Sequence, residues 1–346
     1  MKILVTGAAG FIGYHVTKKL LENGYEVVGV DNLSNYYDTN LKLARLQDLG
    51  IPISDAKKER NECISTITDY PFSFVRLDIG KKEQLTPLFA QHHFDVVCNL
   101  AAQAGVRYSL EHPDVYMESN FVGFLNILES CRHNKITHLV YASSSSVYGL
   151  SKNIPFQVED NVDLPISLYA VSKRSNELMA HAYSHLFHFA TTGLRFFTVY
   201  GPWGRPDMAP YLFTSAIAKG EPISVFNHGK MERDFTFVKD IAEGVVRVIA
   251  KKVQQRLEEQ DYYKIYNIGN NKAVSLMDFI NEIEKNLNTK AKMKMLPIQP
   301  GDIERTWANV EGLIKDYGYS PKTTLKDGIK EYVTWFKSYY NISLDD

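Results

Sequence analysis

Short apolar runs alternate with longer amphipathic segments through the first two hundred residues. Buried strands are expected at 2–6, 26–31, 74–78, 95–100, 138–143 and 191–196. Helices are expected between them, at 11–23, 82–91, 115–134 and 169–187. Because repeated strand–helix units build parallel sheets with helices on both faces, the pattern predicts a doubly wound α/β fold.

Beyond position 200 the alternation is broken, with four prolines between positions 202 and 222. The elements expected there are helices at 210–219 and 238–250, a strand at 265–268 and a C-terminal helix at 325–339. The change predicts a sheet domain over 1–200, whose sheet later segments could complete, and a smaller α/β lobe over 201–346. Residues 51–71 are rich in polar side chains and predict an inserted loop.

Composition narrows the functional class. Acidic and basic residues are interspersed and nearly balance, at a formal net charge of −1, which argues against a nucleic-acid-binding surface. Cys63, Cys98 and Cys131 lack the paired spacing of a disulfide framework or a zinc site, and the scattered histidines indicate no metal cluster. We therefore expect a cytoplasmic protein without a bound metal.

Residues 1–14 resemble a secretory signal only superficially. Glycines recur at a regular interval inside the apolar stretch, and no cleavage-type segment follows it. No later run is apolar enough to cross a bilayer, so no membrane partner is expected.

The same glycines lie where a dinucleotide-binding loop is expected, between the first strand and the first helix. Glycine lets the backbone turn tightly and approach a pyrophosphate, and the N–H groups and dipole at the helix start favour its charge. The segment therefore predicts a Rossmann-type domain, although its GxxGxxG spacing differs from the GxGxxG of typical dehydrogenases. The candidate cofactor contacts in it are Gly7, Gly10, Phe11, Ile12 and Gly13.

Asp31 ends the second expected strand, where its carboxylate can accept hydrogen bonds from an adenosine ribose. NAD is therefore favoured over NADP, although a strand-end aspartate can also simply cap a turn. Further cofactor candidates follow the third and fourth strands at the same edge of the sheet: Asp78, Ile79, Leu100, Ala101 and Ala102. For the two alanines, close packing explains the residue type equally well.

Tyr169 and Lys173 are four positions apart in a helical segment, so their side chains project from one face. A tyrosine, whose reference pKa is about 10, is a poor base at neutral pH. A neighbouring ammonium and a positive nicotinamide ring would stabilise its phenolate. Since the chain has 21 tyrosines, this spacing alone is more typical of a structural pair.

Four consecutive serines, residues 143–146, follow the strand that ends near Ala142. A serine hydroxyl at this sheet edge can hydrogen-bond a reacting oxygen and share its proton with the tyrosine. A polar turn would explain the run in isolation. The coincidence of this run with the glycine loop and the Tyr169 helix favours a catalytic site.

The chain resembles the extended short-chain dehydrogenase/reductases along nearly its whole length. The similarity is carried by GAAGFIG at 7–13, SSSSVYG at 143–149, YAVSK at 169–173 and RFFTVYGPWGRPDMA at 195–209. VYGPWGRPDMA, NHG at 227–229 and RDF at 233–235 most closely resemble UDP-glucuronate 4-epimerases. The resemblance implies NAD as cofactor, a UDP-sugar substrate, polysaccharide precursor biosynthesis, and a homodimer packed through helices 115–134 and 169–187.

The resemblance also implies roles for individual residues. Ser144, Tyr169 and Lys173 would be the catalytic trio, and Tyr169 and Lys173 would also contact the cofactor. Among the candidate substrate contacts, Ser144 would contact the sugar, Ser145, Ser146 and Thr198 would hold its carboxylate, and Arg205 would lie near that carboxylate. Arg233 would contact the diphosphate. The remaining candidates are Gln103, Arg107 and Asp302. Surface salt bridges are an equal alternative for Arg107 and Asp302.

Two positions distinguish the chain from galactose-type epimerases, which place Asn where Thr198 stands and Arg where Gln299 stands. Both favour an acidic sugar, although residues 305–307 depart from the glucuronate pattern. Related dehydratases carry Asp-Glu, and related decarboxylases carry Glu, where this chain has Ser145 and Ser146. The absence of that acid favours epimerisation.

The resemblance implies that Tyr169 removes the C4 hydroxyl proton while hydride passes to NAD, and that hydride returns to the opposite face of the turned 4-keto sugar. An epimerase for a UDP-N-acetylhexosamine or its uronic acid is the alternative within the class. A catalytically silent NAD-binding sensor is the alternative outside it, because fold alone does not imply turnover. The intact trio argues against the sensor.

Overall fold

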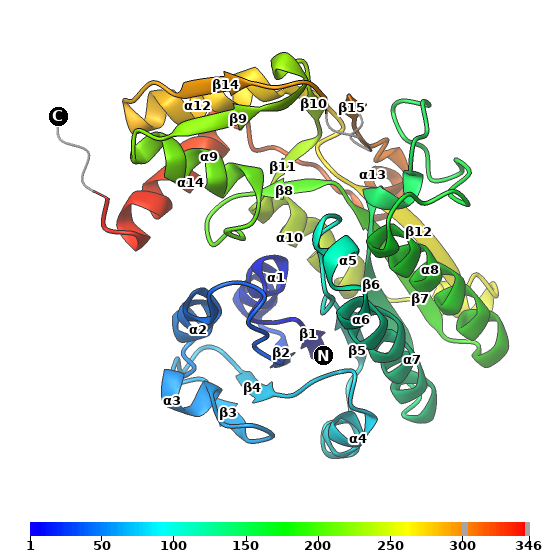
Figure 1. Cartoon of the computed structure of the whole chain (residues 1–346). Coiled ribbons are helices and arrows are strands. Elements are labelled where there is room, and N and C mark those ends of the chain that lie inside the picture. The colour runs from blue at the N-terminus through cyan, green and yellow to red at the C-terminus, as the bar shows by residue number, and fades with distance from the viewer. Residues whose placement is uncertain (299–303, 343–346) are drawn as a thin grey trace. The chain divides into compact units, whose positions relative to one another are not determined.

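The computed structural model describes residues 1–298 and 304–342, and Figure 1 traces the chain from blue to red. It forms two compact units. Unit 1 comprises residues 1–149, 161–196 and 242–266, and unit 2 comprises 150–160, 197–241 and the described part of 267–346. Among the described residues, no helix has the length and apolar character needed to span a membrane.

Unit 1 is built on one eight-stranded sheet, in the order β12-β7-β6-β5-β1-β2-β4-β3. Its strands are β1 (Lys2–Thr6), β2 (Glu26–Asp31), β3 (Glu62–Ile64), β4 (Phe72–Arg76), β5 (Val96–Asn99), β6 (His138–Ser144), β7 (Ala190–Phe196) and β12 (Tyr263–Ile268). β1, β2, β4, β5, β6 and β7 are paired in parallel, and β3 is antiparallel to β4 at one edge. The predicted doubly wound parallel sheet is therefore confirmed.

The strand order reverses between β1 and β5, because β2 and β4 extend the sheet on one side and β6 and β7 on the other. In such sheets, ligands bind at this reversal, beyond the carboxyl ends of the strands. All seven residues of β7 are buried, as expected for a parallel strand covered by helices on both faces. This burial explains why runs rich in apolar residues marked most of the strands in the sequence, although β7 itself also contains Thr191, Thr192 and Arg195.

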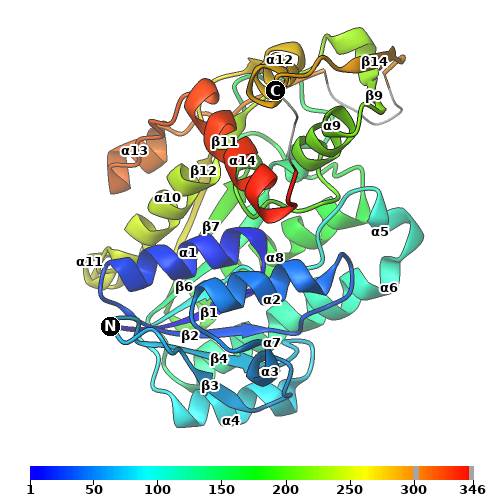
Figure 2. The same ribbon diagram turned by 90° about the vertical axis from the view of Figure 1, so that its left-hand side faces the viewer.

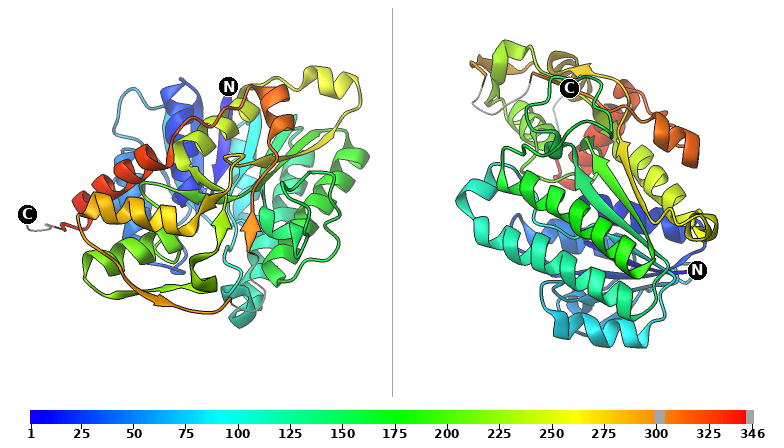
Figure 3. Two further views of the ribbon diagram at one scale, coloured as in Figure 1. Left: turned by 90° about the horizontal axis from the view of Figure 1, so that it is seen from above. Right: turned by 90° about the vertical axis from the view of Figure 1, so that its right-hand side faces the viewer.

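The helices of unit 1 lie on both faces of the sheet. They are α1 (Phe11–Glu22), α2 (Thr39–Asp48), α3 (Ile53–Ala56), α4 (Lys82–Gln91), α5 (Tyr108–Glu111), α6 (Pro113–Tyr116), α7 (Gly123–His133), α8 (Leu168–Phe187) and α11 (Gln254–Glu258). Figure 2 shows α1 on one face, and Figure 3 shows α7 and α8 side by side on the other. α10 (Val238–Ala250) begins in unit 2 and ends in unit 1.

The helix expected at 115–134 contains a π-helical turn, Met117–Val122, between α6 and α7. This turn buries Asn120, whose side-chain nitrogen donates to the Gln103 carbonyl at 2.9 Å and to the Ser172 hydroxyl at 2.9 Å. The Asn120 carbonyl in turn accepts from the side chain of Asn176 at 2.7 Å. The π-helical turn thus places Asn120 inside the protein, where its polar groups have the partners that a buried polar residue requires.

The inserted loop expected at 51–71 is wrong in part, because this segment contains α3 and the edge strand β3. The middle residue of β3, Cys63, is buried against the sheet, and β3 pairs with β4 through the register Cys63↔Phe74. With three residues, the strand is too short for periodicity to reveal it.

Unit 2 combines short strand pairs with helices. Its strands are β8 (Thr198–Tyr200), β9 (Pro222–Val225), β10 (Glu232–Arg233), β11 (Phe235–Phe237), β13 (Val274–Ser275), β14 (Lys292–Met295) and β15 (Arg305–Thr306). Its helices are α9 (Ala209–Ala218), α12 (Leu276–Leu287), α13 (Glu311–Tyr317) and α14 (Leu325–Tyr339). Its core contains Tyr200, Phe235, Phe279, Ile283 and Phe336, so it has an apolar interior of its own.

Candidate active site

The glycine loop joins β1 to α1 at the sheet edge where the strand order reverses. Gly7 has a φ of 71°, and the Gly10 N–H donates to the Gly7 carbonyl at 2.8 Å. A Cβ on Gly13 would lie 2.0 Å from that carbonyl oxygen, so only glycine fits there. α1 has no side-chain N-cap and no acidic residue in its first turn. Its first N–H groups therefore suit an anion such as a pyrophosphate.

Asp31 lies at the end of β2 and is 8% exposed. Its carboxylate accepts hydrogen bonds from the Ala9 N–H at 3.2 Å and the Leu33 N–H at 2.8 Å. The ammonium of Lys42 lies 3.6 Å from it. Asp31 therefore fixes the glycine loop to the end of β2, and its oxygens retain acceptor capacity for a ribose hydroxyl.

The other predicted cofactor residues have different surroundings. The Asp78 carboxylate accepts from the Asn32 side chain at 3.1 Å and from the Gly80 N–H at 2.8 Å. Ile79 is buried in the apolar core, where its carbonyl accepts from Asn126. Its side chain is therefore a packing group.

The segment after β5 packs directly on the glycine loop. The Leu100 N–H donates to the Thr6 carbonyl at 3.2 Å, and the Ala101 N–H donates to the Thr6 hydroxyl at 3.1 Å. A Cβ on Gly7 would lie 2.8 Å from the Ala101 nitrogen, and both Ala101 and Ala102 are half-buried. Close packing is thus established for Ala101, and contact with a cofactor stays a prediction for these three residues.

Tyr169 and Lys173 lie in the first two turns of α8, which Ser167 starts by accepting the Ala170 N–H at 3.1 Å. Tyr169 is half-buried, and Lys173 is 3% exposed. The Lys173 ammonium donates to the Ala142 carbonyl at the end of β6, at 2.9 Å. Burial lowers the pKa of Lys173 to about 8, because desolvation disfavours the charged ammonium.

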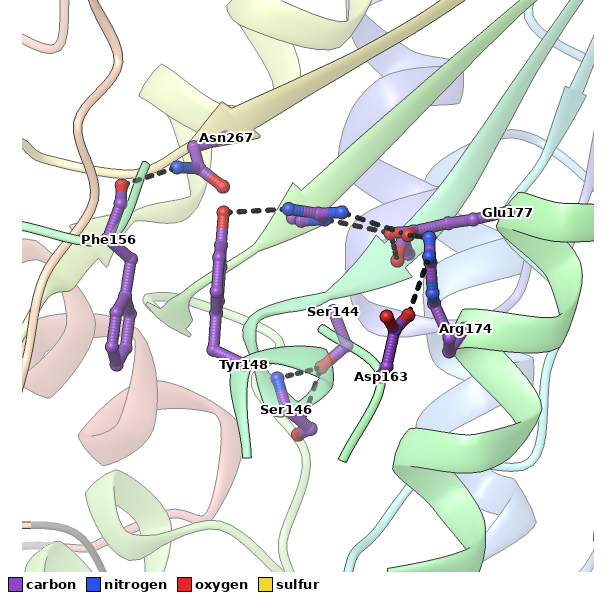
Figure 4. Close-up of polar contacts among 10 residues, drawn as sticks. Ser144, Ser146, Tyr148, Phe156, Asp163, Arg174, Glu177 and Asn267 are labelled. Carbon is purple, nitrogen blue, oxygen red and sulfur yellow. Dashed lines mark hydrogen bonds and ion pairs between the residues drawn. The ribbon is translucent and has the colours of Figure 1, made fainter. Parts of the chain in front are cut away.

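The serine run continues β6 into the 3-10 turn η2 (Ser145–Tyr148). The Ser144 hydroxyl accepts the Ser146 N–H and donates to the Ser146 hydroxyl, both at 3.1 Å (Figure 4). α8 packs against both β6 and η2. The structure therefore brings the predicted serines to the helix that carries Tyr169 and Lys173, at the same sheet edge as the glycine loop.

Gln103 and Arg107 follow β5. The Gln103 N–H donates to the Asn120 side chain at 2.8 Å, and its own side chain donates to the Ala104 carbonyl at 3.1 Å. Arg107 is exposed at the start of α5. Substrate contacts stay predictions for both residues.

Three predicted substrate residues belong to unit 2. Thr198 begins β8, and its N–H donates to the Asp234 carbonyl at 3.2 Å. Arg205 forms an ion pair with Asp207. Arg233 donates to the carbonyls of Glu232 at 2.9 Å and Glu304 at 3.0 Å. Asp302 and Gln299 lie outside the described residues.

A buried polar cluster behind the serines was not predicted from the sequence. Glu177 on α8 and Arg195 on β7 form an ion pair, and Ser143 and Tyr148 are bound to it. One signal was available, since Arg195 interrupts an apolar strand where a lone charge would be costly. Sequence spacing offered no means of finding its partner, 18 positions away.

This arrangement suits proton transfer to and from a hydroxyl group. A phenol and an ammonium one helical turn apart favour phenolate, and a serine at the adjoining strand end can hold the reacting oxygen. Among the described residues, no group of three or more His, Cys, Asp or Glu side chains is placed to hold a metal ion.

The chain is similar to known proteins along its length. The model of the NAD dependent epimerase/dehydratase family matches residues 3–269. Protein CapI from Staphylococcus aureus is 48% identical, over 98% of this chain and 99% of its own length. UDP-glucuronate 4-epimerase 2 from Arabidopsis thaliana is 41% identical, over 98% of this chain and 76% of its own length.

A solved structure also matches over the same range. The crystal structure of UDP-glucuronic acid 4-epimerase from Bacillus cereus, in complex with UDP-glucuronic acid and NAD, superposes with a TM-score of 0.85 at 34% identity. The match covers 98% of this chain and 100% of that one.

Proposed function

This chain belongs to the NAD-dependent epimerase/dehydratase family, and on that basis we propose that it inverts C4 of UDP-glucuronate to give UDP-galacturonate through a transient 4-keto sugar. The observation that carries the proposal lies in unit 1. There the glycine loop, Ser144 and the Tyr169–Lys173 pair come from neighbouring strand ends and one helix start. The similarity to UDP-glucuronate 4-epimerases over 98% of the chain supports the choice of sugar.

NAD, when bound, supplies the reversible oxidation of C4. The tight glycine loop and the uncapped start of α1 fit its pyrophosphate, and Asp31 fits its adenosine ribose. We assign Tyr169 and Lys173 to the nicotinamide end, where Lys173 would also hold the ribose.

Tyr169 acts as the base that takes the C4 hydroxyl proton and later returns it. The Lys173 ammonium favours the phenolate, and the Ser144 hydroxyl holds the C4 oxygen and shares its proton. Between the two steps the keto sugar turns over, so that the reduction occurs on its opposite face. Because the proton and both electrons return to the sugar, no external oxidant is consumed.

A 4-keto uronic acid is a β-keto acid, which tends to lose carbon dioxide when its carboxylate bond is perpendicular to the carbonyl plane. We propose that the hydroxyls of Ser145, Ser146 and Thr198 hold the carboxylate away from that alignment. Neither Ser145 nor Ser146 can act as an additional acid or base at neutral pH. Epimerisation is therefore favoured over elimination and decarboxylation.

We propose that the chain forms a homodimer through the helical segments 115–134 and 169–187, which contain the π-helical turn Met117–Val122, α7 and α8. Met117, Val122, Leu125, Leu178 and Leu186 are exposed apolar residues on these helices. Exposed apolar side chains gathered on neighbouring helices are typical of an association surface. A cytoplasmic location and a role in polysaccharide precursor biosynthesis are further proposals, the former supported by three free, buried cysteines.

The test is incubation of the purified protein with UDP-glucuronate without added reductant, with the products resolved by NMR. UDP-galacturonate without UDP-pentose supports the proposal. If bound NAD is detected and UDP-glucuronate stays unchanged, the sugar assignment is wrong, and N-acetylated UDP-sugars become the candidates. If these also stay unchanged, an NAD-binding sensor is favoured.

A further inference from the structure

A buried ion pair lies behind the serine segment and has no role in the proposed mechanism. The Glu177 carboxylate is fully buried, and Arg195 is 2% exposed. Two guanidinium nitrogens of Arg195 donate to the two carboxylate oxygens, at 2.8 and 3.0 Å. The same carboxylate accepts from Arg174 at 3.2 Å, as Figure 4 shows. The pair is therefore bidentate and fixed in orientation.

Each partner of the pair holds one end of the segment 143–148. The Ser143 hydroxyl donates to Glu177 at 2.6 Å. A third nitrogen of Arg195 donates to the Tyr148 hydroxyl at 3.0 Å. Ser144, Ser145 and Ser146 lie between these two anchors.

Successive turns of α8 reach the end of β6. Lys173 donates to the Ala142 carbonyl at 2.9 Å, and Glu177, one turn later, accepts from Ser143 at 2.6 Å. Tyr169 lies one turn before Lys173 on the same helix. Contacts made by Lys173 and Glu177 thus hold the helix that carries Tyr169 against the end of β6, next to Ser144.

The charges of Glu177 and Arg195 form directional hydrogen bonds, which an apolar contact would not provide. Burial opposes the charge of Arg195, but the hydrogen bonds and negative charge of Glu177 raise its pKa, so the guanidinium stays protonated. Replacing a buried ion pair by apolar residues is often neutral or stabilising. Directional bonds instead favour one position of α8 relative to the strands that it covers.

We propose that the Glu177–Arg195 pair positions the reaction machinery by fixing both ends of the segment 143–148, which carries Ser144, against the helix that carries Tyr169 and Lys173. The inference rests on the proposed function for its chemistry. Glu177 and Arg195 act through Ser143 and Tyr148, so they are positioning residues.

Removing single anchors tests this inference without leaving a buried charge unpaired. Ser143→Ala and Tyr148→Phe each delete one hydroxyl and keep the ion pair. The matched control is Ser184→Ala, because Ser184 on α8 and Thr191 on β7 share a buried hydrogen bond of 2.7 Å at the far end of the same helix and strand. Loss of a buried hydrogen bond should destabilise all three variants by about 1 kcal/mol.

The measurements are kcat and KM for UDP-glucuronate, and amide hydrogen exchange of residues 144–149. We expect Ser143→Ala and Tyr148→Phe to lower kcat about tenfold with KM nearly unchanged, since small displacements of catalytic groups carry large rate costs. Exchange of the segment should become faster in both variants. Ser184→Ala should change neither kcat nor that exchange.

If both anchor variants match Ser184→Ala in kcat or in exchange, the positioning role is wrong. A wild-type protein that leaves UDP-glucuronate unchanged would contradict the proposed function instead. The exchange comparison would then still decide whether the pair holds the segment.

Discussion

The ammonium nitrogen of Lys173 lies 2.9 Å from the carbonyl oxygen of Ala142, inside the protein and at the end of the strand that carries the serines. Burial lowers the pKa of this lysine to about 8. The Lys173 ammonium is thus buried although burial disfavours its charge, as expected of a residue that serves catalysis at the expense of stability.

Replacing Lys173 by Met should abolish epimerisation while making the protein more stable at pH 7, by about 1–3 kcal/mol. The variant is expected to be the more stable protein because the pKa of Lys173 is lowered on folding, so that the unfolded chain binds the lysine proton more tightly than the folded one. Wild-type stability should therefore rise relative to the variant between about pH 8, the pKa of Lys173 in the folded protein, and pH 10.5, the ordinary pKa of lysine. Urea denaturation of both proteins at pH 7 and pH 10 measures this difference, and a constant difference would contradict it.

Thr198→Ala should increase the share of UDP-pentose among the products, because the carboxylate loses one of its proposed hydroxyl donors. Thr214→Ala is the control, since Thr214 is a buried threonine whose hydroxyl donates within α9, to the Pro210 carbonyl. Product ratios are measured by NMR at equal conversion. An unchanged ratio in Thr198→Ala would count against the carboxylate role.

Gly13→Ala should prevent tight binding of NAD, because its Cβ would lie 2.0 Å from the Gly7 carbonyl oxygen and displace the loop. We expect affinity to fall by about two orders of magnitude or the domain to misfold. Gly24→Ala is the control, since Gly24 has a φ of 74° and no atom within 4 Å of the added Cβ. It should lose stability from backbone strain and retain NAD, as measured by calorimetric titration and thermal unfolding.

Leu178→Glu should convert the proposed dimer into a monomer, because it places a charge on the exposed apolar face of α8. Leu110→Glu, at a more exposed leucine on α5, should leave the assembly unchanged. Light scattering after size-exclusion chromatography gives both masses. Equal masses for the two variants would refute this interface.

Much of the fold followed from the sequence, because most buried parallel strands leave runs rich in apolar residues and glycine positions are dictated by backbone geometry. β1 and β2 begin and end where expected, and so does α14. The family was identified from motifs that the family model confirms. These features depend on local patterns, which a sequence records directly.

Features that depend on tertiary partners were not predictable. In the π-helical turn Asn120 contacts Gln103 and Ser172 inside the protein, and helical periodicity carries no sign of it. Charged residues are mostly exposed in proteins, so helical periodicity gives no sign that Glu177 is buried, and its contact with Arg195 explains that burial. The roles of the individual site residues remain predictions for the experiments above.

The central claim, that C4 is oxidised and then reduced within one active site, is tested most directly with UDP-glucuronate deuterated at C4. The proposed mechanism predicts UDP-galacturonate that retains the deuterium at C4, with no loss to solvent and no added reductant. UDP-galacturonate that has lost the label, or a product inverted at another carbon, would contradict it.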